Sequence, residues 1–416
     1  MGRSVVHVVG AGLAGLAAAV RLAGGPRDVV LHEAARHAGG RCRSYYDPAL
    51  GMTIDNGNHL LLSGNSDAQN FLAAIGAEDQ LAGPPEADFA FADLATGERW
   101  RLRPNAGPFP WWIFSSRRRV PGTGPLDYLG LLRLLVPGKD APIGARMRQN
   151  GLLYERLWRP FFLAALNTDP GEGSSKLAAA VVRETLARGG RACRPLVARQ
   201  GLSAAFIDPA LTTLMKRGAK IHFEHRLRAI GFAMGRANAF HFGDTVLPLG
   251  AGDKIILAVP PQVAASLVPG LQTPETYRAI VNAHFNIAPP ADFPPLMGIV
   301  NGTIEWLFAF PDRLSVTISG ADRLLDVPRE ELAARIWAEV AKVTQIEKPL
   351  PPWQIIKEKR ATFAATVTEN RRRPGIGTAY ANLILAGDWT ATGLPATIEG
   401  AIRSGHRAAD AIAANR

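Results

Sequence analysis

The pattern of apolar and polar positions predicts short buried strands that alternate with helices. Residues 5–9 form an apolar run that glycines follow directly, and the next ten positions are rich in Ala and Leu. Residues 29–33 form a second apolar run that ends in an acid. This succession indicates a strand, a tight turn, a helix and a parallel strand, which is the βαβ unit of an α/β fold.

Similar patterns recur along the rest of the chain. Residues 89–93 and 98–102 predict a hairpin around Thr96-Gly97. Ser174 or Ser175 is a suitable N-cap and Gly189-Gly190 a suitable stop for the helix over 174–189, and Gly218 ends the helix over 202–217. We expect helices over 124–136, 142–165, 174–189, 202–217, 329–344 and 395–414, and strands over 220–224, 253–259, 296–300, 303–310, 314–320 and 383–386.

The first turn carries the spacing GxGxxG in the setting that a dinucleotide site requires. Gly10 permits the tight turn, Gly12 lets the backbone approach a pyrophosphate, and Gly15 allows close packing of helix on strand. The helix N-terminus faces the phosphate charge, and Glu33 at the end of the second strand binds a ribose hydroxyl. The expected contacts are Gly10, Ala11, Gly12, Leu13, Ala14, Gly15, Glu33 and Ala34.

Two further segments favour FAD over NAD. A Gly39-Gly40-Arg41 loop follows the acid and is suited to more phosphate or to flanking a flavin. Near the C-terminus a buried strand ends at Gly387-Asp388, and a helix of small residues follows. A long, bent cofactor touched by both chain ends explains this arrangement, with the second acid beside the ribityl hydroxyls. The expected contacts are Gly39, Gly40, Arg41, Gly387, Asp388, Pro395, Ala396 and Thr397.

These motifs together resemble the FAD-dependent amine oxidase and phytoene desaturase superfamily. Residues 55–65 (DNGNHLLLSGN), 176–184, 195–203 and 359–363 are similar to the hydroxysqualene dehydroxylases of hopanoid pathways, and the resemblance spans essentially the whole chain. It implies a Rossmann-like FAD-binding domain of the amine oxidase type with an inserted α+β substrate domain. The FAD-binding domain is expected over 1–85, 196–268 and 361–416, and the substrate domain over 86–195 (mostly helical) and 269–360 (sheet plus helix).

The resemblance also implies a reaction, the reduction of hydroxysqualene to squalene by hydride from flavin N5. Departure of the allylic hydroxyl leaves a resonance-stabilised cation, so the site needs a donor for the leaving oxygen and a dry, apolar tunnel. Gly57, Asn58 and His59 are expected at the flavin face. His59 is the candidate donor because an imidazole carries a proton near neutral pH. Lys359 and Arg360 are alternatives that would stabilise reduced flavin.

Three other functions fit the same motifs. A phytoene or carotenoid desaturase shares the fold and the lipid substrate but runs in the oxidising direction. An amine oxidase needs an aromatic cage and often a covalent cysteine, whereas the C-terminal motif offers Trp389 and no cysteine. A non-catalytic, flavin-dependent lipid-binding protein is the third alternative. Because only one GxGxxG is present, no second nicotinamide domain is visible and the electron donor stays open.

Composition restricts the remaining classes. With 416 residues, 47% hydrophobic and 20% charged, the chain has the size and composition of a two-domain globular protein. Its two cysteines, Cys42 and Cys193, exclude a disulfide scaffold, and the histidines show no metal-ligand spacing, so no metal is expected. Cys42 lies in the glycine–arginine loop, where packing is favoured over a redox role. Because no window of 18 apolar residues occurs, we expect a cytoplasmic protein without a spanning helix.

The net charge of +11 raises the question of an anionic partner. Nucleic acid is not expected, because the basic residues are dispersed and no nucleic-acid-binding motif is present. Residues 110–114 (PWWIF) run into Arg117-Arg118-Arg119, and the apolar stretch 126–136 follows. This sequence predicts a patch, anchored by Trp111 and Trp112, that contacts the inner face of an anionic cell membrane. The alternative is a core-facing helix with a solvated basic turn.

Overall fold

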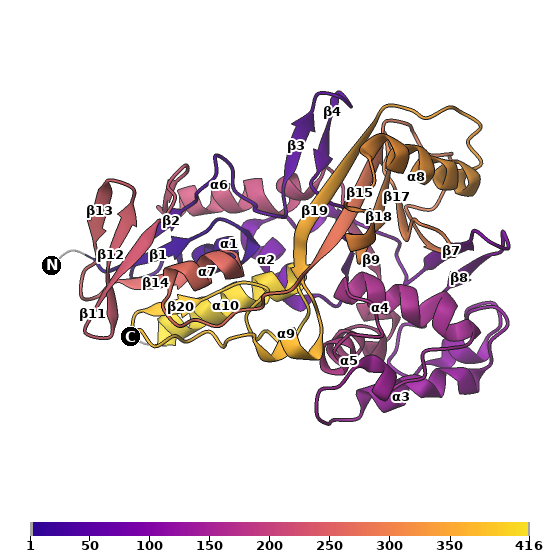
Figure 1. Ribbon diagram of the computed structural model, residues 1–416, viewed down its shortest axis with the longest axis horizontal. Helices are drawn as coiled ribbons and strands as arrows, with labels where there is room; N and C mark the ends of the chain where they lie inside the picture. Colours follow the sequence, from indigo (N-terminus) through magenta and orange to yellow (C-terminus); the bar gives the residue numbers. More distant parts are fainter. Residues whose placement is uncertain (1–2, 415–416) are drawn as a thin grey trace.

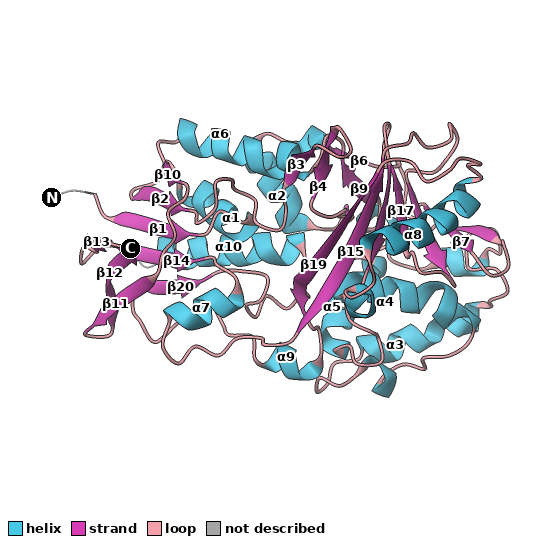
Figure 2. Ribbon diagram, turned by 45° about the horizontal axis from the view of Figure 1, so that its top comes forward, coloured by secondary structure: helices cyan, strands magenta, loops and turns pink. Residues whose placement is uncertain are grey.

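Two sheets organise the chain in the computed structural model, which describes residues 3–414 (Figures 1 and 2). The first is a five-stranded parallel sheet with β1 at its centre. Its central strands β1 and β14 are buried almost throughout, which explains their nearly continuous apolar runs, whereas β10 at one edge is partly exposed. In sheet order they are β10 (Lys220–His222), β2 (Asp28–His32), β1 (Val5–Val9), β14 (Lys254–Leu257) and β20 (Leu383–Leu385), so distant parts of the chain share one sheet.

Helices cover one face of the parallel sheet, and a small sheet with a helix covers the other. The helical layer contains α1 (Leu13–Leu22), α2 (Ser66–Ile75), α6 (Asp208–Lys216) and α10 (Ile398–Ala414). The opposite layer contains β11 (Ala229–Ala233), β12 (Arg236–Phe242), β13 (Thr245–Pro248) and α7 (Pro261–Leu267). Small residues bring α1 and α10 together, since a Cβ on Gly405 would lie only 2.2 Å from the Ala14 carbonyl oxygen.

The second sheet has seven strands and is antiparallel except where β16 pairs with β7. One face packs against α8 (Arg329–Thr344), and the other faces the helices α3 (Gly130–Leu135), α4 (Arg159–Leu166) and α5 (Ser175–Glu184). In sheet order the strands are β19 (Trp353–Phe363), β15 (Tyr277–Phe285), β18 (Leu314–Ile318), β17 (Trp306–Ala309), β16 (Leu296–Val300), β7 (Phe89–Asp93) and β8 (Arg99–Leu102). The substrate domain was expected to end at residue 360, but β19 continues past that residue to Phe363.

Shorter elements join these layers. They are the hairpin β3 (Ser44–Asp47) and β4 (Met52–Asp55), the strands β5 (Leu61–Leu62), β6 (Leu81–Ala82) and β9 (Pro195–Ala198), and the helix α9 (Val367–Arg371). Single helical turns lie at 78–80, 111–114, 125–129, 143–145, 186–188, 190–192 and 321–324.

The structure confirms most of the predicted elements, including the first βαβ unit, the hairpin, α8 and the Ser174 N-cap of α5. The helix predicted over 142–165 is wrong in its first part, because Gly144 and Gly151 interrupt the pattern and Gly151 adopts φ +89°. Wide π-helical turns at 154–158 and 203–207 directly precede helices whose second residue is proline. Proline lacks an N–H and clashes with the carbonyl four residues earlier, so the wider turn relieves the clash.

Candidate cofactor and substrate site

The turn between β1 and α1 has no room for side chains at two of its glycines. Gly10 adopts φ +104°, and a Cβ there would lie 2.5 Å from the Ala258 carbonyl oxygen. A Cβ on Gly15 would lie 1.9 Å from the Gly10 carbonyl oxygen. A Cβ on Gly12, by contrast, would meet nothing within 4 Å, so this position borders open space. The loop is therefore closed towards the protein and open on the side where a ligand would lie.

The N-terminus of α1 is suited to an anion. Gly12 is its N-cap and offers no side-chain acceptor, and the first turn contains no acid. Ala11, Leu13 and Ala14 are buried around this helix end. Unpaired N–H groups and the positive end of the helix dipole then favour a phosphate.

Glu33 follows β2 and is held against the glycine turn. One carboxylate oxygen accepts a hydrogen bond from the Ala11 N–H at 2.7 Å, and the other accepts one from the Ala35 N–H at 2.8 Å. Ala34 between them is exposed. Each carboxylate oxygen retains a further lone pair, so the predicted contact with a ribose hydroxyl stays chemically open.

The glycine–arginine loop brings the C-terminal motif to the same turn. The Gly39 N–H donates to the Ala11 carbonyl at 2.8 Å, and two residues later the Arg41 guanidinium pairs with the Asp388 carboxylate at 2.7 Å. Asp388 is buried, raises the pKa of Arg41 and holds it in place, whereas the Arg41 side chain is 46% exposed. Gly387, just before the acid, donates its N–H to Ser404 Oγ on α10.

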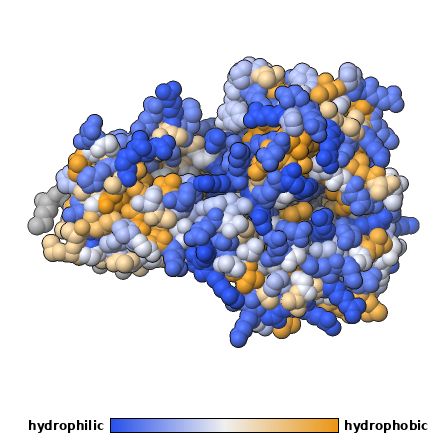
Figure 3. Space-filling model, viewed as in Figure 1, coloured by the Kyte–Doolittle hydropathy of each residue, from blue (hydrophilic) through white to orange (hydrophobic). Residues whose placement is uncertain are grey.

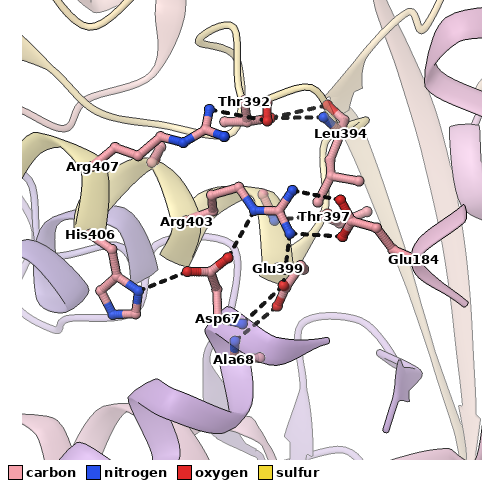
Figure 4. A network of polar contacts seen from close by, with 12 residues as sticks. Asp67, Ala68, Glu184, Thr392, Leu394, Thr397, Glu399, Arg403, His406 and Arg407 are labelled. Atoms are coloured by element: carbon pink, nitrogen blue, oxygen red, sulfur yellow. Dashed lines mark hydrogen bonds and ion pairs between the residues drawn. The ribbon is translucent and has the colours of Figure 1, made fainter. Parts of the chain in front are cut away.

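An ion-pair network anchors α10 to its neighbouring elements (Figure 4). Arg403 contacts the carboxylates of Asp67, Glu184 and Glu399 at 2.8, 2.7 and 3.1 Å. Glu399 also accepts the N–H groups of Asp67 and Ala68 at the start of α2. Burial by itself would raise the pKa of Asp67, but hydrogen bonds from His406 and Arg403 lower this pKa to about 2. The network ties α10 to α2 and α5, and the predicted contacts Pro395, Ala396 and Thr397 directly precede α10.

Residues 55–65 are attached to the seven-stranded sheet. The Asn58 N–H donates to Asn282 Oδ1 on β15 at 3.3 Å, and its side-chain amide donates to Thr317 Oγ1 on β18 at 3.2 Å. A Cβ on Gly57 would lie 2.9 Å from Asn282 Nδ2, so the backbone runs directly over that amide. The Asn58 side chain is therefore used to fix the segment on the substrate-side sheet, and its predicted contact with flavin stays a prediction.

The neutral form of the His59 imidazole is favoured at neutral pH. Burial, and secondarily the nearby Arg41 guanidinium, lower its pKa to about 4. The lowered pKa argues against a charged imidazole as the donor, because burial and a neighbouring cation both disfavour the charged form. A neutral imidazole retains one N–H, so a role as hydrogen-bond donor stays a prediction.

The structure also locates the remaining candidates. Arg360 lies over the Tyr277 ring at 5.5 Å, and both it and Lys359 are exposed. Cys42 is buried and its pKa is raised by burial and by Asp55, which supports packing rather than redox chemistry. Within residues 3–414, no group of three or more His, Cys, Asp or Glu side chains is arranged to hold a metal ion.

Apolar side chains from separate stretches form one core cluster between the seven-stranded sheet and the helices facing it. Trp158 and Phe162 come from the helix at 154–166, Leu296 from β16, and Trp306 and Phe308 from β17. Such stretches are suited to line the apolar tunnel that the reaction requires. Asn282 and Thr317 were not predicted as site residues, although an Asn and a His two positions apart in an otherwise apolar strand (residues 279–285) are a usable signal of a polar wall.

These residues fit a dinucleotide. An open glycine turn, an uncapped helix end, an acid after β2 and a half-exposed arginine provide the contacts that a pyrophosphate and a ribose require.

Comparison with known proteins defines the class. The family of flavin containing amine oxidoreductases matches residues 13–413. Among solved structures, cyclohexylamine oxidase from Brevibacterium oxydans superposes with a TM-score of 0.71 at 16% identity, covering 100% of this chain and 99% of that one. The chain belongs to the flavin-containing amine oxidoreductases and is an FAD-dependent oxidoreductase with their α/β fold.

Closer relatives define the group within that family. The chain is 57% identical to hydroxysqualene dehydroxylase from Rhodopseudomonas palustris over 410 residues, which cover 98% of each chain. It is 54% identical to hydroxysqualene dehydroxylase from Sinorhizobium fredii over 405 residues, which cover 97% of each chain. Within the amine oxidoreductases, the chain thus belongs to the hydroxysqualene dehydroxylase family.

Proposed function

We propose that this enzyme reductively removes the hydroxyl group of hydroxysqualene to give squalene. The observation that carries the proposal is the buried aromatic and aliphatic cluster on the same sheet that anchors residues 55–65. An isoprenoid chain needs such an environment, whereas a small polar amine does not. The names of the two relatives, at 57% and 54% identity, support this substrate.

The overall reaction is balanced by one hydride and one proton. The C–O bond breaks, the hydroxyl takes up a proton and leaves as water, and a new C–H bond forms at the same carbon. When bound in its reduced form, FAD supplies the hydride and therefore both electrons.

The chain's own residues provide position, charge balance and dryness. Arg41, fixed by Asp388, offers a cation at the cofactor side, while Glu33 orders the glycine turn. Trp306, Phe308 and their neighbours exclude water, which would otherwise recapture a cationic substrate. His59 lies close enough to Arg41 for the two to interact electrostatically, and its neutral N–H is available to the leaving oxygen.

Product analysis with detergent-dispersed substrate tests the reaction. The purified holoenzyme, supplied with a chemical reductant, should convert hydroxysqualene to squalene in extracted lipids. The same enzyme with its flavin oxidised should leave phytoene unchanged. Squalene formation supports the proposal; desaturated phytoene with no squalene would replace it with a carotenoid-type desaturase. Bound flavin without turnover of either lipid would favour a lipid-binding protein.

The reductant and the location of the enzyme complete the proposal. The single glycine fingerprint leaves a reductase, a quinone or transient NADPH as sources of electrons. No helix in the described part of the chain is long and apolar enough to cross a membrane. We propose a cytoplasmic enzyme that meets its lipid substrate at the inner face of the cell membrane.

A further inference from the structure

Large apolar side chains are exposed in one short stretch of the helical region. Phe109, Trp111 and Phe114 point outwards, with Trp111 65% exposed. Their rings form a cluster, because the centroids of Phe109 and Trp111 lie 4.3 Å apart and those of Trp111 and Phe114 lie 6.2 Å apart. Trp112 is buried, so the prediction that it anchors a membrane contact is wrong.

A second row of apolar side chains lies on the adjoining helical segment. Leu126, Leu129 and Leu132 are spaced by three residues, which places them on one side of the helical turns at 125–135. All three are at least half exposed, and Leu126 is 79% exposed. We call these three leucines together with Phe109, Trp111 and Phe114 the docking face.

The buried side of the same segments holds the docking face together. Trp112 packs edge-to-face on Tyr128 with 5.1 Å between ring centroids, which joins the aromatic row to the leucine row from beneath. Trp112, Tyr128 and Leu134 belong to the apolar cluster proposed to receive the substrate. The docking face is thus the outer surface of a layer whose inner surface contacts that cluster. In Figures 1 and 2, α3 lies at the outer margin, beyond α4 and α5.

Positive charge is concentrated in the chain segment that contains the docking face, although Arg101, Arg103 and Arg156 pair with Asp88, Asp93 and Glu98 just before it. Residues 99–199 contain 18 Lys and Arg against 6 Asp and Glu, a net charge of +12, whereas the whole chain carries +11. The rest of the chain is therefore nearly neutral. Arg117 and Arg133 are exposed beside the docking face, whereas Arg119 is used internally, donating to the Thr123 and Ile113 carbonyls. Figure 3 shows apolar side chains among strongly hydrophilic ones along the lower margin, where α3 lies in Figure 1.

An anionic bilayer satisfies both features at once. Its acyl boundary accepts aromatic and leucine side chains, and its phosphates attract the flanking arginines. Nucleic acid offers the charge but no apolar layer. A second copy of this chain offers the apolar surface but repeats the positive charge, so the two faces would repel each other.

We propose that the docking face inserts into the headgroup region of an anionic phospholipid bilayer, with Arg117 and Arg133 on lipid phosphates. The docking itself does not depend on which reaction the enzyme catalyses. That a lipid substrate would pass from the bilayer through the helical layer beneath the docking face rests on the proposed function.

Vesicle sedimentation tests the docking. The holoenzyme should bind vesicles of phosphatidylcholine with phosphatidylglycerol and bind pure phosphatidylcholine weakly. The triple variant Trp111→Ser, Leu126→Ser, Leu132→Ser should bind the mixed vesicles roughly tenfold or more weakly. Arg117→Ser with Arg133→Ser should remove most of the preference for anionic lipid and its salt sensitivity.

A matched control comes from elsewhere on the surface. Met234 is 98% exposed and Val246 is 53% exposed, both on or beside the β11–β13 sheet. Met234→Ser with Val246→Ser should leave vesicle binding unchanged. Flavin absorbance per chain verifies that every variant is folded.

Three outcomes would overturn the docking. They are equal sedimentation of the triple variant and the unmodified enzyme, no binding to mixed vesicles by either, and a dimer in solution that only the triple variant dissociates. Turnover of detergent-dispersed hydroxysqualene, measured on the same preparations, separates this result from a failure of the proposed reaction.

Discussion

Arg41 and Asp388 lie 347 positions apart in the chain, yet their side chains form an ion pair with 2.7 Å between Nη2 and Oδ2. The arginine comes from the loop that hydrogen-bonds to the glycine turn, and the aspartate follows β20. The pair therefore joins both ends of the chain at the cofactor site. Asp388 is almost completely buried and Arg41 is half exposed. Asp388 therefore holds the Arg41 side chain in position, and Arg41 remains accessible to a ligand.

The first prediction concerns this pair. Asp388→Ala should weaken FAD binding by about tenfold or more, because it releases Arg41 and removes an acid expected at the ribityl hydroxyls. Flavin absorbance per chain after gel filtration measures the loss. Asp410→Ala, which breaks the surface pair with Arg21, is the control and should retain full flavin. Full occupancy in Asp388→Ala would contradict the role of the pair.

Two glycine variants separate folding from cofactor binding. Gly15→Ala places a Cβ 1.9 Å from the Gly10 carbonyl oxygen, so it should lower the thermal stability of the protein even without flavin. Gly12→Ala enters open space, so the apoprotein should keep its Tm while FAD affinity falls because the methyl group occupies the approach to the phosphates. Thermal melts of both apoproteins and flavin titrations give the comparison. Equal flavin affinity in Gly12→Ala and the unmodified protein would place the pyrophosphate elsewhere.

The network at Arg403 makes a prediction about stability. Arg403→Met should lower the free energy of unfolding by about 3–5 kcal/mol, because it leaves three buried or half-buried carboxylates without their cation. Arg21→Met, at a half-exposed pair, should cost about 1 kcal/mol or less. Denaturant unfolding at neutral pH measures both, and equal losses would contradict the account.

The same network gives a dependence on pH. The pKa of Asp67 is about 2 in the folded protein, below the value of about 3.9 for an unperturbed aspartate. Its stabilising contribution is therefore present above about pH 4 and is lost as the pH falls towards 2. Asp67→Asn should flatten that part of the acid unfolding curve. An unchanged curve would show that other carboxylates dominate it.

His59 makes a prediction about catalysis. Because its pKa is about 4, the imidazole is already neutral across the range near pH 7, and no activity change in that range should arise from its titration. His59→Gln keeps a hydrogen-bond donor and should alter kcat without changing the shape of the pH profile between about pH 5.5 and 8. If the pH profile of the unmodified enzyme has an inflection near pH 7 and His59→Gln lacks it, His59 titrates in that range and the account is contradicted.

The cofactor side of the molecule could be predicted from local sequence, and the substrate side only partly. The glycine turn is built from residues that lie within 24 positions of one another, so their spacing in the sequence is enough to predict how they are arranged. These residues are Gly10, Gly12, Gly15 and Glu33. β19 was not predicted as a strand, because its middle (Lys357-Glu358-Lys359-Arg360) is polar and only pairing with β15 makes it one.

Burial and long-range pairing could not be predicted in the same way. Trp111 and Trp112 are neighbours of one residue type, yet one is exposed and the other is in the core. The shift in the His59 pKa comes from burial and, secondarily, from Arg41, which a different loop supplies. Such properties arise from tertiary packing, which a local pattern does not encode.

An anaerobic single turnover tests the central claim most directly. The purified holoenzyme is chemically reduced, freed of excess reductant and mixed with hydroxysqualene while flavin absorbance is recorded and lipids are extracted. The account predicts that flavin becomes oxidised as squalene appears, in equal amounts. Flavin that stays reduced while hydroxysqualene is recovered intact would contradict it.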